Sequence, residues 1–207
     1  MKKIFIILSI FVVISISQFI SAQQIAGSSH DFSVQTWNTS GQICIVCHTP
    51  HNANTTVTDA PLWNHSLSAT ATYTMYSSTT MNSIAGQPDG SSKLCLSCHD
   101  GTVALENFGG VTTGTHLLTG NSMLGTNLSN DHPISITYDA ALATADGGLY
   151  NPTTALSGLG GTINTNLLSS GKMQCSSCHD VHNSAGVLGL LRKSNAGSAL
   201  CLTCHHK

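Results

Sequence analysis

The sequence predicts a fold that is mostly irregular coil, with a few short helices and little regular sheet. No long helical stripe of apolar residues and no sustained strand-like alternation runs through the 207 residues. After the first 22 residues, Leu, Ile, Val and Phe fill only 36 of 185 positions, whereas Ser, Thr, Gly and Asn fill 80. Charged residues make up only 8% of the chain, which is too few for a typical disordered tail. The interior therefore needs apolar material that the side chains do not supply.

The first segment has the layout of a secretory signal peptide. Lys2 and Lys3 precede an apolar run at 4–16, and small residues at 21–22 offer a cleavage point. We therefore predict a signal peptide at 1–22 and one mature domain at 23–207, which works outside the cytoplasm. An uncleaved membrane anchor is the alternative, because the apolar stretch reaches about 17 residues, the short limit for crossing a bilayer.

Short helices are expected at three places along the mature chain, namely 91–99, 139–145 and 196–205. The long stretch at 101–171 is rich in Gly and Thr, and its pairs of neighbouring glycines predict turns. Because this stretch is too long for an ordinary loop, we expect coil with short strands or turns that wraps a bound group.

All eight cysteines fall into four copies of one motif, Cys-x-x-Cys-His. This pattern is typical of covalent attachment of c-type haem. Two thiols on one helical turn can add to the two vinyl groups of a porphyrin, and the following His can bind its iron. We predict four covalently attached haem c groups, stacked inside the coil, which would supply the missing apolar surface. The thioether residues are Cys44, Cys47, Cys95, Cys98, Cys175, Cys178, Cys201 and Cys204.

Three other uses of paired cysteines explain the pattern less well. A disulfide scaffold suits an exported chain, but it gives no reason for a His after every second Cys. Two zinc sites would use the four cysteine pairs, and they too leave the fixed His unexplained. A thioredoxin-like pair would occur once, in a β-α-β setting that this sequence lacks.

Histidines are numerous enough to bind all four irons on both faces. The proximal ligands are the last residues of the motifs, His48, His99, His179 and His205. Seven further histidines remain for four sixth positions, which predicts bis-His ligation and low reduction potentials. At least one histidine is spare, and His116, an exposed His206 and the methionines rank lower as ligands. The distal candidates are His30, His51, His65, His132 and His182.

Sequence spacing limits which iron two of these candidates can reach. His51 and His182 each follow a motif histidine by three residues, and three residues span roughly 10 Å at most. That is too short to pass around a porphyrin edge to the other face of the same iron. Each is therefore expected to bind the iron of a neighbouring haem, either in a close pair or in another subunit.

These motifs together resemble the doubled-motif multihaem cytochromes c, in particular the tetrahaem outer-surface cytochrome E type of metal-reducing bacteria. That resemblance implies coil around a continuous haem stack and protomers that polymerise into extracellular conductive filaments. It also implies that a histidine of one protomer completes a haem in the next, for which His51 is the first choice and His30 the second. The stretches that carry the resemblance are 44–52, 62–65, 95–104, 130–133 and 175–182.

The predicted function is electron transfer between haems without substrate chemistry, so the chain is not expected to be an enzyme. Expected partners are further copies of the chain, redox proteins and extracellular electron acceptors. Nucleic acid is excluded, because a net charge of −2 offers no basic surface. We expect an extracellular or outer-surface location, with the periplasm as the alternative. A monomeric periplasmic shuttle and a reductase with one open haem are the alternative functions.

Overall fold

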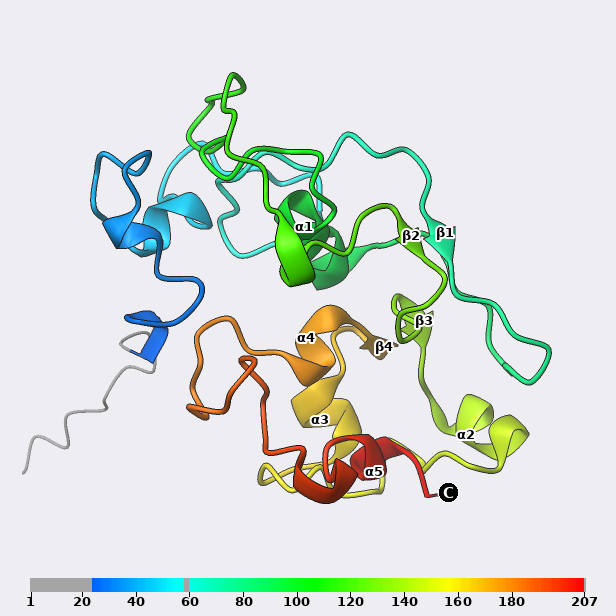
Figure 1. Cartoon of the computed structure of the whole chain (residues 1–207). Coiled ribbons are helices and arrows are strands. Elements are labelled where there is room, and N and C mark those ends of the chain that lie inside the picture. Colours follow the sequence, from blue (N-terminus) through cyan, green and yellow to red (C-terminus); the bar gives the residue numbers. More distant parts are fainter. Residues whose placement is uncertain (1–23, 58–59, 207) are drawn as a thin grey trace, which may run out of the picture.

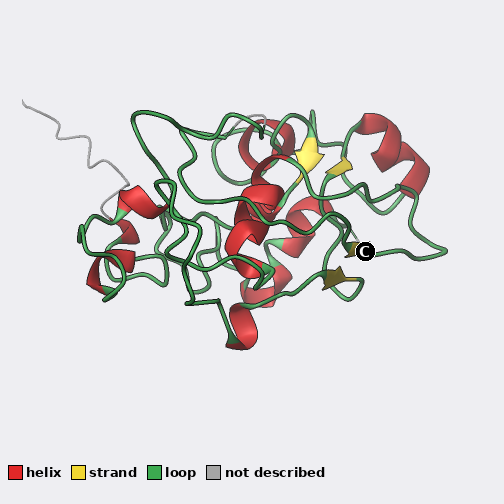
Figure 2. Cartoon of the chain, turned by 90° about the horizontal axis from the view of Figure 1, so that it is seen from above, coloured by secondary structure: helices red, strands yellow, loops and turns green. Residues whose placement is uncertain are grey.

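The computed structural model describes residues 24–57 and 60–206, most of which lie in loops and turns (Figures 1 and 2). The predicted fold class, mostly coil with a few short helices and little regular sheet, is confirmed. The predicted signal peptide at 1–22 lies outside the described residues. Across the described part of the chain, no helix has the length and apolar character needed to cross a membrane.

Short helices and single 3-10 turns are spread along the described chain. Most are far shorter than the roughly 12–15 residues at which an isolated helix becomes stable, so tertiary contacts must hold them. The helices are α1 (Gly90–His99), α2 (Ala140–Asp146), α3 (Ile163–Leu167), α4 (Cys175–Cys178) and α5 (Cys201–Cys204). The 3-10 turns are η2 (Phe32–Val34), η3 (Cys44–Val46), η4 (Gly120–Ser122) and η5 (Ala196–Ser198).

Two of the three predicted helices lie where they were expected. The stretch 91–99 forms α1, and 139–145 forms α2, which begins one residue later because Asp139 is its N-cap. The prediction of one helix over 196–205 is wrong. Gly197 has a positive φ of 59°, so the chain leaves the helical path at η5 before α5 begins. Helix α3 lies in a stretch that was expected to be coil.

Two very small sheets join parts of the chain that are distant in sequence. Strand β1 (Thr74–Met75) pairs in parallel with β2 (Asn127–Leu128). Strand β3 (Ile136–Thr137) pairs antiparallel with β4 (Lys172–Met173), directly before α4. Helix α1 packs on α4, and α4 packs on α3, so two motif-bearing helices meet in the middle of the molecule (Figure 1).

The buried apolar residues form three small clusters, whereas an ordinary domain has one contiguous core. Each cluster touches an attachment motif, through Cys204, Cys47 or Leu96. The apolar side chains are thus gathered around the motifs. The first cluster contains Tyr138, Ala143, Ile163, Leu167, Met173 and Cys204; the second contains Val57, Trp63 and Leu94; the third contains Tyr73, Leu96 and Leu128.

Candidate haem-attachment sites

Each motif forms a helical turn that brings its thiols and its histidine together. The four motifs lie at η3, at the end of α1, at α4 and at α5. The backbone N–H groups of His48, His179 and His205 donate to the carbonyl of the first cysteine of their own motifs, at 2.8, 3.0 and 3.0 Å. Residues three and four apart on such a turn share one face. All eight cysteines are free thiols, as attachment to vinyl groups requires.

Hydrogen bonds from ring Nδ1 to backbone carbonyls orient several of the histidines. A carbonyl oxygen can only accept, so Nδ1 carries the proton and Nε2 keeps its lone pair for a metal. Metal-binding histidines are commonly held in this way. The bonds run from His48 to Pro61, from His99 to Ser122, from His179 to Gly189 and from His132 to Pro133, at 2.6, 2.7, 2.9 and 2.9 Å.

Three of the four motif histidines face a second imidazole from elsewhere in the chain. A metal–nitrogen bond is about 2 Å long, so imidazoles on opposite sides of one ion have ring centres roughly 6 Å apart. The three observed spacings fit one iron between each pair of rings. The ring centres are 6.0 Å apart for His99 and His30, 6.1 Å for His48 and His182, and 6.3 Å for His205 and His132.

These pairs differ from a metal site made by protein ligands alone. Within residues 24–57 and 60–206, no three side chains of the His, Cys, Asp or Glu type come together to hold an ion. A pair of axial imidazoles needs the other ligands from a porphyrin, which the cysteines of each motif are placed to tether. The residues present therefore fit a covalently attached haem.

His30 is buried in a form that suits a metal ligand. Burial is the main cause that lowers its pKa to about 4, and nearby His99, His179 and His182 lower it further. The ring is therefore neutral at neutral pH, which is the form that binds a metal. Its Nδ1 is buried without a hydrogen-bond partner. An unsatisfied buried polar atom costs about 1–3 kcal/mol. A bonding partner for this nitrogen would therefore stabilise the site, and the described polypeptide supplies none.

A cavity of about 280 Å³ lies beside the fourth motif. His132 and His205 both line it, together with Cys204, Tyr138 and Met173. The same space thus holds two facing imidazoles, one motif thiol and apolar walls. That combination suits the apolar ring of a porphyrin more than a free metal ion.

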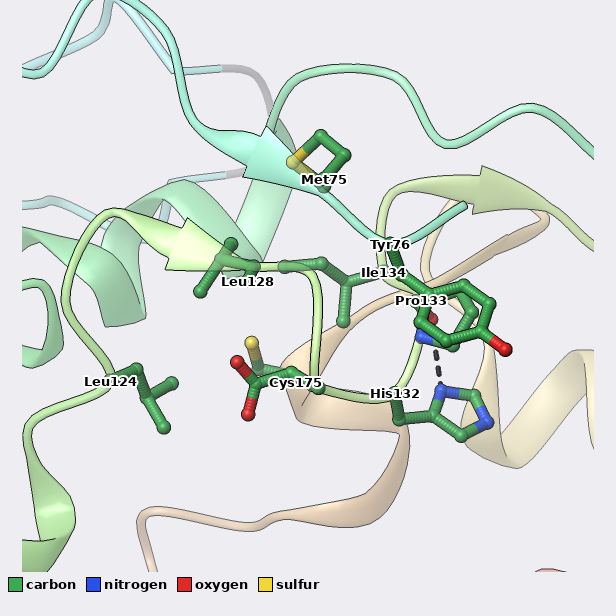
Figure 3. Close-up of a pocket in the computed structure, with 9 residues that line it drawn as sticks. Met75, Tyr76, Leu124, Leu128, His132, Pro133, Ile134 and Cys175 are labelled. Atoms are coloured by element: carbon green, nitrogen blue, oxygen red, sulfur yellow. Dashed lines mark hydrogen bonds between the residues drawn. The ribbon is translucent and has the colours of Figure 1, made fainter. Parts of the chain in front are cut away.

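A smaller cavity, about 40 Å³, lies beside the first thiol of the third motif. Figure 3 shows the sulfur of Cys175 near Leu128 and Leu124, and Ile134 also lines this cavity. The His132 ring lies at the edge of this cavity, held by its bond to the Pro133 carbonyl. The thiol therefore faces a cavity with mostly apolar walls, to which Asp131 adds one carboxylate, and a thioether to a porphyrin edge would fit there.

His179 is the motif histidine that no second imidazole faces within the described residues. Its side chain is exposed, although its Nδ1 is fixed by Gly189. His51, a distal candidate, is also exposed and has no side-chain hydrogen bond in the described part of the chain. The structure does not bring these two histidines together within one chain, and their predicted roles stay predictions.

His65 is a distal candidate that lies in the interior, where its ring contacts Trp63 and no ring contact joins it to a motif imidazole in the described residues. It is only 1% exposed, and burial is the main cause that lowers its pKa. Its two ring nitrogens lie 2.8 and 3.0 Å from the carbonyl oxygens of Ser66 and Ala104. Its Nε2 also lies 3.6 Å from the Cys98 sulfur. This position resembles that of a hydrogen-bonded core histidine near the second motif.

Two histidines that ranked lower as ligands have definite places. His206 is exposed, as predicted, and its ring centre lies 4.7 Å from that of Tyr150, with the two rings tilted by 51°. The Nδ1 of His116 donates to Glu106 at 2.7 Å. Sequence reasoning missed this pair, and no local signal points to it, since the two residues are ten positions apart in a glycine-rich loop. It missed the carbonyl partners of the motif histidines too, because any residue can supply a carbonyl.

A comparison with known protein families finds one match. Residues 168–207, which contain the third and fourth motifs, match the family described as "Doubled CXXCH motif". A search of curated proteins found no match. The doubled motif, together with the arrangement of thiols and imidazoles, supports a multihaem c-type cytochrome that binds haem covalently.

Proposed function

We propose that this chain is an electron-transfer protein that carries four covalently attached haem c groups, each held between two imidazoles. The observation that carries the proposal is the repeated pairing of a motif histidine with a second imidazole at 6.0–6.3 Å. When bound, each haem supplies an iron that gains and loses one electron.

Named side chains of the protein would hold these groups. The two thiols of each motif would form the tethers, and the hydrogen bonds at Nδ1 of His48 and His99 orient rings whose Nε2 would bind the iron. An iron held by two imidazoles would leave no place for a substrate, which favours electron transfer over catalysis. The proposed pairs are His99 with His30, His48 with His182, and His205 with His132.

The haem of the third motif, bound at His179, would take its second imidazole from another copy of the chain, which makes the protein the protomer of an extracellular filament. His179 and His51 are both exposed, so His51 of one copy can approach His179 of the next. His30, the second choice for this role, already faces His99 in its own chain. Leu188, next to the residue whose carbonyl orients His179, is 96% exposed and offers apolar surface for the contact.

The low content of charged residues and the predicted export of the chain support the same filament. With charged residues at only 8%, neighbouring copies repel one another weakly. The predicted signal peptide places the assembly outside the cytoplasm, where redox proteins and extracellular acceptors are its electron partners. Nothing in this role requires nucleic acid or a membrane span in the mature domain.

Replacing His51 tests the assembly. In His51→Ala, filaments seen by electron microscopy should be lost, while mass spectrometry still finds four haems per chain. The exposed His206 offers a matched control, and His206→Ala should form filaments like the unchanged chain. Unchanged filaments in His51→Ala would reassign the ligand. Native material that sediments as small particles, with every haem six-coordinate, would contradict the filament itself.

The lack of a second imidazole opposite His179 in the described residues also favours a second candidate function, a reductase in which the haem of the third motif is open. This enzyme would show a high-spin ferric signal in native material and would bind cyanide or nitrite rapidly. The filament requires that native assemblies show low-spin haems only. A high-spin signal that appears in His51→Ala and is absent from native filaments supports the shared ligand.

A further inference from the structure

The contact between α1 and α4 is polar and buried. At its centre lies the side chain of Gln174, the N-cap of α4, which is 3% exposed. Its Oε1 accepts hydrogen bonds from the hydroxyls of Ser92 on α1 and Ser135 before β3. Its Nε2 donates to Asp89 Oδ1, at the N-cap of α1, at 2.7 Å. One amide therefore joins three segments of the chain.

Further hydrogen bonds connect the two motif-bearing helices at the same place. The backbone N–H of Cys175 donates to Ser92 Oγ at 3.0 Å, and the hydroxyls of Ser91 and Ser176 lie 2.6 Å apart. Gly90 has a φ of +46°, and a Cβ there would lie 3.3 Å from the Gln174 Nε2. A larger residue at this position would therefore push the amide away from α1.

This junction brings together the first cysteines of two different motifs. Cys95 lies one helical turn after Ser91 on α1, on the face that meets Ser176. The thiols of Cys95 and Cys175 are close enough to interact. Each thiol is the main influence on the other, which raises the pKa of Cys95 and lowers that of Cys175 to about 7. The tethers of the second and third haems thus start side by side.

A polar junction in this place is better suited to fixing position than to adding stability. Well-packed apolar side chains commonly stabilise a buried contact as well as a polar network does, but they allow the elements to slide. A network in which every partner is satisfied specifies one arrangement. The amide oxygen and the amide nitrogen of Gln174 both have hydrogen-bond partners of this kind.

We propose that Gln174 is a positioning residue for electron transfer between the second and third haem sites. Its amide fixes α1 against α4 and thereby sets the separation of the two groups tethered at Cys95 and Cys175. This inference rests on the proposed function and names a determinant of the spacing between two of its sites.

The test compares Gln174→Leu with Gln42→Leu, since Gln42 is exposed and distant in sequence. Both variants are produced as the full haem-loaded chain. Circular dichroism in the Soret band reports dipole coupling between neighbouring haems. We expect Gln174→Leu to lose amplitude in the paired Soret bands and to shift one step of the redox titration. Haem content and low-spin absorption should stay the same, and Gln42→Leu should match the unchanged chain in every measurement.

A second pair of variants tests whether exchanging the hydrogen-bond donor and acceptor between positions 174 and 89 restores the Soret coupling. Gln174→Glu places a carboxylate against Asp89 and should also reduce the Soret coupling, whereas adding Asp89→Asn restores a donor and should restore the coupling. Should Gln174→Leu fail to fold, Ser135→Ala, which removes one hydrogen bond, should give a smaller loss. Full Soret coupling in a destabilised Gln174→Leu would overturn the inference. A chain without covalent haem would instead overturn the proposed function.

Discussion

At the scale of single residues, one hydrogen bond decides how an imidazole can be used. The bonds from Nδ1 of His48 and His99 to carbonyl oxygens leave Nε2 as the only free lone pair. The Nδ1 of His116 also donates, but its acceptor is the carboxylate of Glu106 in a loop near the surface. There the hydrogen bond stabilises the ionised carboxylate and the loop, so its loss should lower the stability of the folded protein.

Glu106 links the stability of this loop to pH. Partial burial tends to raise its pKa, but backbone N–H groups of Thr115 and His116 and the His116 ring lower it from 4.5 to about 2. Because the folded pKa is below the unfolded one, the unfolded chain binds more protons as the pH falls from 4.5 to 2. The stability that ionised Glu106 contributes is therefore present above this window and is lost within it.

We expect Glu106→Gln to be less stable than the unchanged chain at pH 7 and to lack this part of the pH dependence. Thermal unfolding followed by circular dichroism between pH 7 and pH 2 measures both effects. Parallel curves for the two proteins across the window would show that Glu106 carries no such linkage.

At the scale of elements, the helices are too short to be stable alone, and a side-chain cap supports α2. The Asp139 carboxylate accepts from the backbone N–H of Leu142 at 2.8 Å at the start of α2. Leu142 in turn lines the cavity shared by His132 and His205. The cap of a seven-residue helix thereby supports the wall of a candidate haem site.

Removing this cap should weaken α2. We expect Asp139→Ala to cost about 1 kcal/mol, the usual value for a lost N-cap. For a domain of this size, that corresponds to a fall of roughly 2–4 °C in Tm. Asp139→Asn keeps the capping oxygen and should stay near the unchanged Tm in the same melting experiment. Equal losses in both variants would mean that the carboxylate acts through its charge instead.

Elements fixed by neighbouring residues could be predicted from the sequence, and contacts between distant residues could not. The cysteine motifs and the Asp139 cap are local, which is why α1 and α2 lie near their expected places. Five histidines were equal candidates, because only the folded chain brings His182 to His48 or His132 to His205. The Gln174 junction joins residues far apart in sequence and left no pattern to recognise.

At the scale of the whole molecule, the apolar interior is divided among three clusters that do not form one core. Each cluster touches a motif, so the bound porphyrins would join them into a continuous interior. The polypeptide by itself buries too few large apolar residues to offset the entropy of ordering a long coil. The fold and the covalent cofactor should therefore form together.

Loss of haem should abolish the fold. A variant with all eight cysteines changed to alanine cannot be tethered to haem, and we expect it to show no cooperative thermal transition and no near-ultraviolet circular dichroism. The haem-loaded chain treated with EDTA should melt as before, since a chelator does not remove covalently held haem. Sensitivity to EDTA, or cooperative unfolding of the eightfold variant, would contradict this dependence.

The closeness of Cys95 and Cys175 has a consequence for biosynthesis. In the oxidising surroundings that the proposed export implies, two neighbouring thiols readily form a disulfide. Such a cross-link would consume one thiol of each of two motifs and would block both attachments. A chain that stays unfolded until it is loaded keeps these thiols apart at the time when they are vulnerable. Because the apolar core is too weak to fold the chain by itself, haem attachment would come first and folding would follow.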